Sequence, residues 1–360
     1  MQNGRTMMLN MLRYLMEKGA SDLHLSVGVV PYIRLNGEIQ PTEFPSLNKE
    51  QCENLIFSLL TEEEKQVYKE TKVLDFSFGE PGLGRFRVNI YQQRGTIAAA
   101  IRLLPMEIYT PEQLGLPIGP IKQFCSLANG LVLVCGPVGS GKTTTLASMI
   151  DYINRTRGSH IISIEDPIEY VHKNIKSLVH QREIRRDTNT FYNALKYILR
   201  EDPDVVVIGE MRDLDTITSA ITIAETGHLV LATLHTGDTS ESIRRIIDVF
   251  PAGQQTQIVA QLSYTLMGVI NQLLMGRIDR YERVLSTEVM VVTPAIQNLI
   301  RENKSEQIYS HLQMGTAYGM QTMNQSLYEL VHKGVISQEV ALSHTRRSKE
   351  LAKLLENQNA

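Results

Sequence analysis

Short apolar runs alternate with segments of helical periodicity in the second half of the chain. The runs at 131–135, 160–164, 205–208 and 229–233 have the length and composition of strands that are buried on both faces. Between the second and third runs, apolar residues recur at helical spacing over 191–199. This alternation predicts an α/β domain in which helices cover both faces of a parallel sheet.

Beyond Gln254 the pattern changes to one that predicts mostly helix. The apolar residues that share one face of this predicted helical segment are Ile258, Leu262, Leu266, Val269, Ile270 and Leu273. We therefore expect a helical C-terminal part after the α/β core.

The first hundred residues lack this rhythm and mix short helices with short strands. An apolar helical stripe ends at Gly19, and the residues around Asn36-Gly37 predict a hairpin turn. A helical stretch is expected over 49–70. The predicted strands are 23–25, 32–35, 75–78, 85–91 and 96–104. Together these elements predict a small α+β domain.

Prolines crowd the boundary between the two patterns, at Pro105, Pro111, Pro117 and Pro120. A cluster of this kind is typical of a stiff linker between domains. The predicted organisation is an N-terminal α+β domain over 1–107, a proline-rich linker over 108–120 and an α/β domain with a helical C-terminal part over 121–360.

The composition fits a globular protein with two cores and argues against several other classes. The chain has 360 residues and a net charge of −3, so its overall charge does not favour nucleic acid as a partner. Its three cysteines are widely spaced, which predicts neither a disulfide framework nor a paired-cysteine zinc site. No apolar run approaches the roughly 20 residues of a membrane span, and the N-terminus lacks the apolar core of a signal peptide. We expect a cytoplasmic protein.

A phosphate-binding P-loop follows the first strand of the α/β domain, with Gly-x4-Gly-Lys-Thr spacing over 136–143. Its glycines can adopt the positive φ angles that turn backbone N–H groups toward a phosphate, and the next helix directs its positive end there. We expect Lys142 to contact the β and γ phosphates of ATP and Thr143 to bind Mg²⁺. The predicted nucleotide-binding residues of this loop are Gly136, Pro137, Val138, Gly139, Ser140, Gly141, Lys142, Thr143 and Thr144.

Two acids follow neighbouring predicted strands and are the candidates for catalysis. Glu210 comes after the apolar run 205–208, and Glu165 begins an acidic cluster after 160–164. In P-loop enzymes such acids hold Mg²⁺ or orient the attacking water. We assign the water to Glu165 and the metal to Glu210, with Lys142 as the third catalytic residue, although the sequence leaves the division between the two acids open.

Cationic and histidine side chains supply the remaining candidates. His235 follows the strand 229–233 and is placed to sense the γ-phosphate by a hydrogen bond. Arginine fingers that reach a nucleotide from another domain or subunit are a second possibility, with ordinary surface charge as the alternative. The candidate arginines are Arg85, Arg87, Arg94 and Arg102.

The P-loop, the two acidic segments and the histidine segment together resemble the signatures of the secretion ATPase superfamily, which powers type II secretion, type IV pili and related machines. These signatures are a Walker A loop, an acidic box, a Walker B segment and a histidine box. They correspond in order to residues 136–143, 164–170, 199–213 and 226–236.

Within that superfamily the chain resembles the ATPases that retract type IV pili. Residues 293–301 are similar to the AIRNL motif associated with retraction, except that Gln297 stands where the motif has arginine. Further similar segments lie at 19–24, 244–251 and 319–323. Extension and secretion relatives generally carry a four-cysteine zinc module, for which this chain has too few cysteines.

The resemblance implies a homohexameric ring of RecA-like motor domains preceded by PAS-like domains, with ATP and Mg²⁺ as ligands. It also implies a location at the inner face of the cytoplasmic membrane, through contacts with an inner-membrane pilus platform protein. The Gln297 departure keeps a second hypothesis open, that of a paralogous pilus ATPase that assists another motor. A related secretion or assembly ATPase is a third hypothesis, and a nucleic-acid motor is a fourth.

Overall fold

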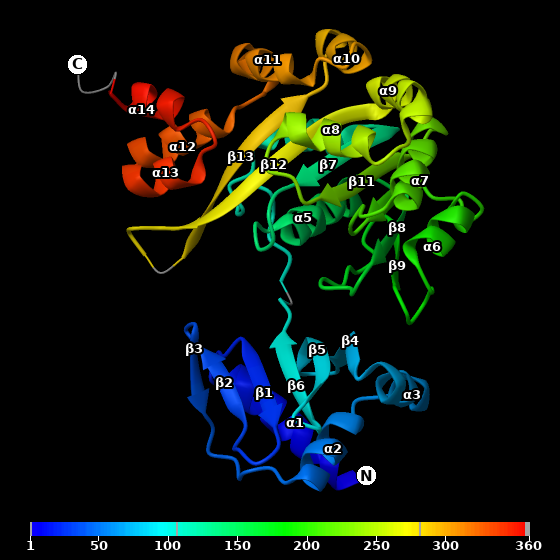
Figure 1. Cartoon of the computed structure of the whole chain (residues 1–360), viewed down its shortest axis with the longest axis vertical. Helices are drawn as coiled ribbons and strands as arrows, with labels where there is room; N and C mark the ends of the chain where they lie inside the picture. Colours follow the sequence, from blue (N-terminus) through cyan, green and yellow to red (C-terminus); the bar gives the residue numbers. More distant parts are fainter. Residues whose placement is uncertain (1, 106, 281, 357–360) are drawn as a thin grey trace. The chain divides into compact units, whose positions relative to one another are not determined.

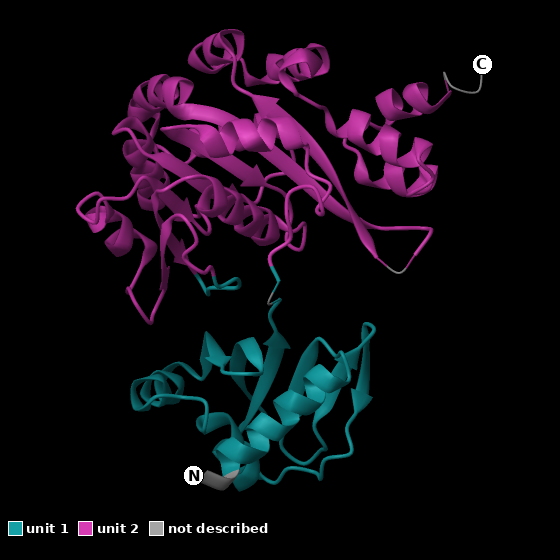
Figure 2. Ribbon diagram, turned by 180° about the vertical axis from the view of Figure 1, so that it is seen from behind, with its two compact units in different colours: residues 1–107, 166–171 teal, residues 108–165, 172–360 magenta. Residues whose placement is uncertain are grey.

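The computed structural model describes residues 2–105, 107–280 and 282–356. The chain divides into two compact units, which Figure 2 colours separately. Unit 1 comprises Met1–Glu107 together with Asp166–Val171, and unit 2 comprises Ile108–Glu165 together with His172–Ala360. Each unit has its own apolar core.

Unit 1 is an antiparallel sheet with helices, as the sequence predicts. The described residues form six strands in the order β3-β2-β1-β6-β5-β4. The strands are β1 (Asp22–Ser26), β2 (Tyr32–Leu35), β3 (Glu38–Pro41), β4 (Val73–Glu80), β5 (Gly84–Gln93) and β6 (Thr96–Leu103), and the helices are α1 (Gln2–Glu17), α2 (Lys49–Phe57) and α3 (Glu62–Thr71) (Figure 1).

The helical stretch predicted over 49–70 forms two helices, because a second N-terminus is built into it. The Thr61 side chain accepts a hydrogen bond from Glu64 N, and the Glu64 side chain accepts one from Thr61 N. This capping box satisfies two N–H groups that a helix start would otherwise leave without partners. The helix therefore restarts at Glu62.

The strand β5 has the alternation that its sequence predicts. Phe86, Val88 and Ile90 are fully buried in the core of unit 1. Arg85 and Arg87 lie on the other face and are partly exposed. One face of the sheet is therefore apolar and the other carries charge.

Unit 2 contains the predicted parallel sheet. Seven strands of the described chain have the order β13-β12-β7-β11-β10-β8-β9, and all neighbours are parallel except β12 and β13. The strands are β7 (Gly130–Cys135), β8 (His160–Glu165), β9 (Leu178–Glu183), β10 (Val205–Ile208), β11 (Leu229–Leu234), β12 (Leu266–Gly276) and β13 (Arg283–Val291) (Figure 1).

Helices connect these strands and continue beyond them. The helices that pack against strands of the sheet include α5 (Lys142–Thr156), α7 (Leu214–Glu225), α8 (Thr239–Asp248), α9 (Ala252–Thr265) and α12 (Met323–His332). The helices of unit 2 are α4 (Ile118–Ser126), α5 (Lys142–Thr156), α6 (Phe191–Ile198), α7 (Leu214–Glu225), α8 (Thr239–Asp248), α9 (Ala252–Thr265), α10 (Pro294–Arg301), α11 (Ile308–Met314), α12 (Met323–His332), α13 (Gln338–His344) and α14 (Ser348–Glu356). The fold is thus an α/β P-loop domain preceded by a small α+β domain.

The helix predicted to continue from Ile258 through Leu273 is wrong in its second half. Helix α9 ends at Thr265, and β12 begins at Leu266 and pairs with both β7 and β13. The strand is largely buried on both faces because it lies between β7 and β13 in the sheet, and most of its side chains are apolar. An apolar run of this kind has no alternation to distinguish it from a buried helix.

The C-terminal helices form a separate small core at the far end of the β12–β13 pair. Its buried members are Met275, Leu327, Ile336, Ala341, Leu351 and Leu355. This core comes from α12, α13, α14, the connection between α12 and α13, and the end of β12, and the yellow to red segments of Figure 1 show the arrangement. The C-terminal helices are therefore attached to the seven-stranded sheet of unit 2 through the β12–β13 pair.

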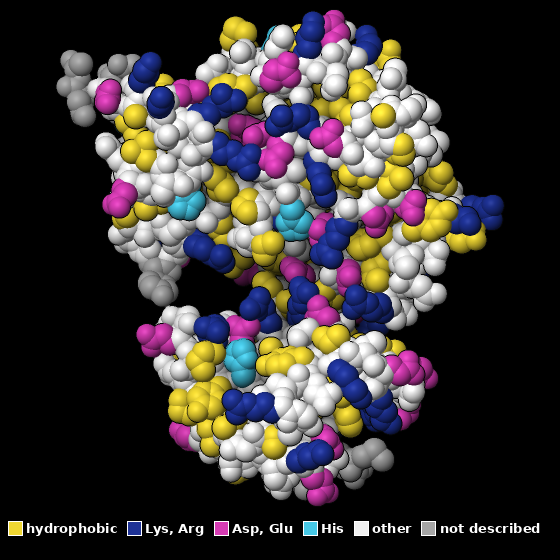
Figure 3. All heavy atoms as spheres, in the orientation of Figure 1, with side chains coloured by type: hydrophobic (Ala, Val, Ile, Leu, Met, Phe, Trp, Pro, Cys, Tyr) yellow, Lys and Arg dark blue, Asp and Glu magenta, His cyan; other side chains and the backbone are white. Residues whose placement is uncertain are grey.

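The charged side chains on the surface of unit 2 agree with the small net charge of the chain. On the face of unit 2 seen in Figure 3, basic and acidic side chains are interspersed, in line with 36 Lys and Arg against 39 Asp and Glu. Among the described residues, no helix has the length and apolar character needed to cross a bilayer.

Candidate nucleotide site

The predicted motifs meet at the carboxyl ends of the parallel strands. The P-loop follows β7, while Glu210 and His235 come just after β10 and β11, two neighbouring strands. Gly136, Gly139 and Gly141 have φ angles of 144°, 79° and 89°, which side chains other than glycine rarely adopt. Helix α5 then begins at Lys142 with its N-terminus at this edge. This arrangement is the usual place for a phosphate ligand in such sheets.

Lys142 is buried against the P-loop, to which it belongs. Its Nζ donates hydrogen bonds to the carbonyl oxygens of Gly136 at 2.9 Å and Pro137 at 3.0 Å. Burial lowers the pKa of Lys142, and the negative charge of Glu210 opposes that effect. The ammonium is therefore held by backbone dipoles that a phosphate can replace.

His235 links Lys142 to Glu210. Its Nδ1 lies 3.1 Å from Lys142 Nζ, and its Nε2 lies 3.0 Å from Glu210 Oε1. An ammonium can only donate, so Nδ1 accepts from Lys142 and the ring proton is on Nε2, from which it is donated to the carboxylate. The histidine thus connects the P-loop with the acid that follows β10.

Glu210 is further held by Arg212, which the sequence does not single out. The distance between Arg212 Nε and Glu210 Oε1 is 2.7 Å. Burial acts to raise the pKa of Glu210, but the hydrogen bond from Arg212 and the nearby His235 outweigh it, so the pKa lies below its usual value. Glu210 is therefore ionised at neutral pH.

Glu165 ends β8 and has a different set of neighbours. Its Oε1 accepts hydrogen bonds from Ser163 Oγ at 2.7 Å and from Gln181 Nε2 at 3.0 Å. The Gln181 amide also accepts from His172 N at 2.8 Å. These bonds connect Glu165 to β8 and β9, whereas Glu210 is bonded to His235 and Arg212. Gln181 is not among the residues that the sequence singles out, because no strand is predicted over 178–183, where β9 lies.

The donor set at the P-loop is suitable for Mg²⁺. Thr143 lies in the first turn of α5, and Glu210 offers a carboxylate whose lowered pKa keeps it charged. Magnesium prefers oxygen ligands, and in nucleotide sites it is commonly held by one or two protein oxygens together with phosphates.

The other predicted P-loop residues differ in exposure: Val138 is 88% exposed and Ser140 is buried. Thr144 is partly buried in the first turn of α5.

The four candidate arginines belong to unit 1. Arg87 pairs with Asp75 at 2.6 Å and Arg102 pairs with Asp22 at 2.7 Å. Arg85 donates to the Ile168 carbonyl at 2.9 Å and also to Ser77. Arg94 is exposed in the turn between β5 and β6, with a φ of 48°. Contact of any of them with a nucleotide stays a prediction.

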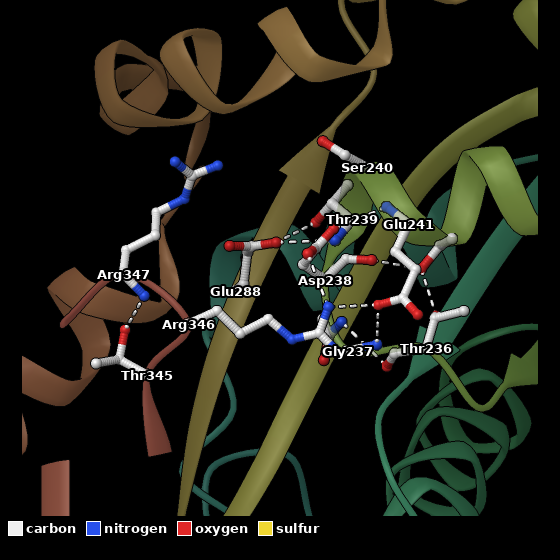
Figure 4. A network of polar contacts seen from close by, with 12 residues as sticks. Thr236, Gly237, Asp238, Thr239, Ser240, Glu241, Glu288, Thr345, Arg346 and Arg347 are labelled. Atoms are coloured by element: carbon white, nitrogen blue, oxygen red, sulfur yellow. Dashed lines mark hydrogen bonds and ion pairs between the residues drawn. The ribbon is translucent and has the colours of Figure 1, made fainter. Parts of the chain in front are cut away.

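The segment that follows His235 takes part in a second polar network, which Figure 4 shows. Arg346, between α13 and α14, donates to Glu241 at 2.5 Å and to Asp238 at 3.1 Å. A Cβ atom at Gly237 would collide with this guanidinium, so glycine allows the close approach. A cavity of ≈ 250 Å³ lies here, lined by residues of 235–241 and 344–347 and reaching Pro137 of the P-loop.

Glu288 is a buried acid on the inner side of this network and is bonded to Thr239. It is 4% exposed and accepts hydrogen bonds from Thr239 N at 2.9 Å and Thr239 Oγ1 at 2.6 Å. Burial raises its pKa, and the charge of Asp238 acts in the same direction. An acid with a raised folded-state pKa contributes stability below its unfolded pKa, and this contribution is lost as the pH rises through the folded value.

We therefore expect Glu288→Gln to stabilise the protein more at pH 8 than at pH 5, by roughly 2–4 °C in melting temperature. The amide keeps the acceptor for Thr239 but carries no charge at any pH. Melting curves of both proteins at the two pH values check this, with the exposed Glu282→Gln as control. A difference that is the same at pH 5 and pH 8 would show that ionisation of Glu288 is not involved.

Comparison with known protein families identifies the family to which this site belongs. The family described as type II/IV secretion system protein matches residues 118–353, which include the P-loop and the segments that carry Glu165, Glu210 and His235. The chain belongs to this family. Its motor unit is thus that of a secretion-type ATPase, and the chain is an ATPase.

Two curated relatives of this ATPase family from Pseudomonas aeruginosa match nearly the whole chain. The type IV pilus retraction ATPase PilT is 47% identical over 348 residues, 96% of this chain and 98% of PilT. The type IV pilus ATPase PilU is 38% identical over 341 residues, 95% of this chain and 89% of PilU. The similarity therefore extends through unit 1 as well as the motor unit.

A solved structure supports the same placement within the family. The crystal structure of the pilus retraction motor PilT with bound ADP has a TM-score of 0.90 and 49% identity, and the match covers 96% of this chain and 98% of that one. The predicted retraction-ATPase resemblance is thus confirmed at the level of the family and of the individual relatives.

Proposed function

We propose that this chain is the ATPase motor that retracts type IV pili. The observation that carries the proposal is the match to PilT at 47% identity over 96% of this chain and 98% of PilT. The site geometry supports it, because Lys142, His235 and Glu210 form one hydrogen-bonded chain between the P-loop and the neighbouring strands. ATP is the proposed substrate and Mg²⁺ the proposed metal, bound by Thr143 and Glu210.

In the proposed cycle, the phosphates of ATP replace the carbonyl groups of Gly136 and Pro137 as partners of Lys142. This change also alters the contact between Lys142 and His235, so His235 reports the presence of the γ-phosphate to the segment that follows it. Glu165 polarises the attacking water. Mg²⁺ supplies charge stabilisation on the phosphates when bound.

We further propose that the chain works as a homohexamer in the cytoplasm. Peripheral association with the inner face of the cytoplasmic membrane follows from contact with an inner-membrane pilus platform protein. In this scheme the domain over 1–107 moves against the domain over 121–360 about the linker 108–120. Nucleotide can drive that motion because it binds one arrangement better than the other. Arginines of unit 1 would then leave their present partners to reach the nucleotide.

The experiment is complementation of twitching motility in Pseudomonas aeruginosa lacking PilT. Expression of this chain should restore twitching, and the Lys142→Ala variant at equal abundance should not. Abundant surface pili that remain without twitching in the presence of the wild-type chain would contradict a retraction role.

A second candidate function is that of an accessory pilus ATPase, as suggested by Gln297 at the position of an arginine in the retraction motif. Gln297 lies on α10, a helix whose Ile296 and Ile300 are buried in the core of unit 2. The relative PilU gives the matched test, since complementation in a strain lacking PilU instead of PilT separates the two. Restoration only in the strain lacking PilU favours the accessory function.

A further inference from the structure

Two consecutive amide side chains are buried in the middle of β12, beside the P-loop. Asn271 and Gln272 are both 0% exposed, in a strand that is otherwise mostly apolar. A buried polar side chain is costly unless its hydrogen bonds are satisfied, and an apolar side chain of equal size would avoid that cost. What these amides contact therefore indicates what they do.

Gln272 contacts both ends of the P-loop. Its Nε2 donates a hydrogen bond to the Ser140 carbonyl at 2.6 Å and lies 3.3 Å from the point where a Cβ on Gly141 would be. Its backbone carbonyl packs so closely against Gly136 that a Cβ there would collide with it. The C=O of Ser140 and the N–H of Gly141 belong to one peptide plane and point in opposite directions, so holding Ser140 O fixes the direction of the Gly141 N–H.

Asn271 reaches the other half of the site. Its Nδ2 donates to the Thr236 carbonyl at 3.3 Å, one residue after His235. In the sheet, Asn271 is paired with Cys135, the last residue before the P-loop, and Cys135 is paired with Leu234, the last residue before His235. One strand thus contacts the loop that binds phosphate and the segment that senses it.

The acceptor atoms of both amides add a second observation. Within the described residues, Asn271 Oδ1 and Gln272 Oε1 are buried and have no hydrogen-bond partner, and the same holds for Ser140 Oγ. Half of the hydrogen-bonding capacity of each amide is thus left unused. General stabilisation does not account for such groups, whereas fixing the backbone of two loops does.

We propose that Asn271 and Gln272 are positioning residues for ATP hydrolysis. Gln272 sets the P-loop for phosphate binding, and Asn271 sets His235 for its contact with Lys142 and Glu210. The inference rests on hydrolysis at the P-loop and is independent of the retraction role, so failure of one leaves the other testable.

The two residues are expected to affect different kinetic constants. Gln272→Met should raise KM for ATP about tenfold with a small change in kcat, because the phosphate cradle is loosened. Asn271→Leu should lower kcat about tenfold with KM nearly unchanged, because it acts through His235. In a His235→Ala background, Asn271→Leu should cause no further loss, as expected for residues that act as one unit.

The purified full-length variants are assayed for ATP hydrolysis, and their melting temperatures are recorded. Thr287→Val is the matched control. Thr287 is the cross-strand partner of Gln272 and is 3% exposed, so this substitution also removes a buried polar group from the same sheet. It should leave both constants within about twofold. Gln272→Leu carries the same expectation as Gln272→Met and serves if that variant does not fold.

Two outcomes would overturn the proposal. One is a kinetic effect of the Gln272 variants equal to that of Thr287→Val, which would make Gln272 a structural residue of the core. The other is a full additional loss from Asn271→Leu when His235 is already alanine, which would mean that Asn271 does not act through His235.

Discussion

Replacing Lys142 by alanine is expected to lower the rate of ATP hydrolysis by about 100-fold or more. The Lys142 ammonium is buried, and its hydrogen bonds go to the Gly136 and Pro137 carbonyls and to His235. If Lys142 contacts the phosphates as proposed, its removal takes away one of their cationic partners, and it also leaves His235 without the donor to Nδ1. Steady-state release of phosphate at saturating ATP measures the effect.

Lys122→Ala provides the matched control for this prediction. Lys122 is a half-exposed lysine of the same unit, and its ion pair with Glu112 spans 3.8 Å. A surface pair of this kind contributes little to stability, so hydrolysis should stay close to the wild-type rate. A Lys142→Ala protein that retained half of the wild-type rate would place the nucleotide elsewhere.

Replacing Glu210 by glutamine is expected to lower kcat by about 100-fold while ATP still binds. Glutamine keeps the shape of the side chain and can still accept from His235 and Arg212, but it removes the negative charge at this edge of the sheet. If Glu210 holds the metal, the variant also needs more Mg²⁺ for half-maximal activity. Glu165→Gln, which removes the proposed water-polarising group, should lower kcat without changing the Mg²⁺ requirement.

The pH dependence offers an independent check on Glu210. Because its pKa lies below the usual value, the carboxylate stays ionised until the pH falls below the range of an ordinary glutamate. Activity that depends on this charge should therefore persist into mild acid. Arg212→Ala should move the acid limb of the pH–activity profile to higher pH, and Glu225→Gln, at the exposed end of α7, is the control.

For the metal assignment, equal Mg²⁺ requirements for Glu210→Gln and wild type would assign the metal to another group.

Most of the motor unit was predictable because its sequence signals are local. The P-loop spacing determines the positive φ angles at Gly136, Gly139 and Gly141, and those angles are present. The apolar runs that precede Glu210 and His235 determine that both side chains emerge at the same edge. Neighbouring strand ends then bring them within hydrogen-bonding distance.

The parts that escaped prediction depend on contacts between distant segments. The apolar run 266–273 has a helical period, yet pairing with β7 and β13 makes it a strand. With a helix predicted there, nothing could place Gln272 beside Ser140. The partners of Arg87 and Arg102 were likewise hidden, because Asp75 and Asp22 come from other strands of unit 1.

Observation of labelled pili on living cells tests the central proposal most directly. In Pseudomonas aeruginosa lacking PilT, the wild-type chain should restore retraction events, and the Lys142→Ala chain at the same abundance should restore none. Pili that extend but never retract in cells containing a wild-type chain that hydrolyses ATP would contradict the proposal that this ATPase drives pilus retraction.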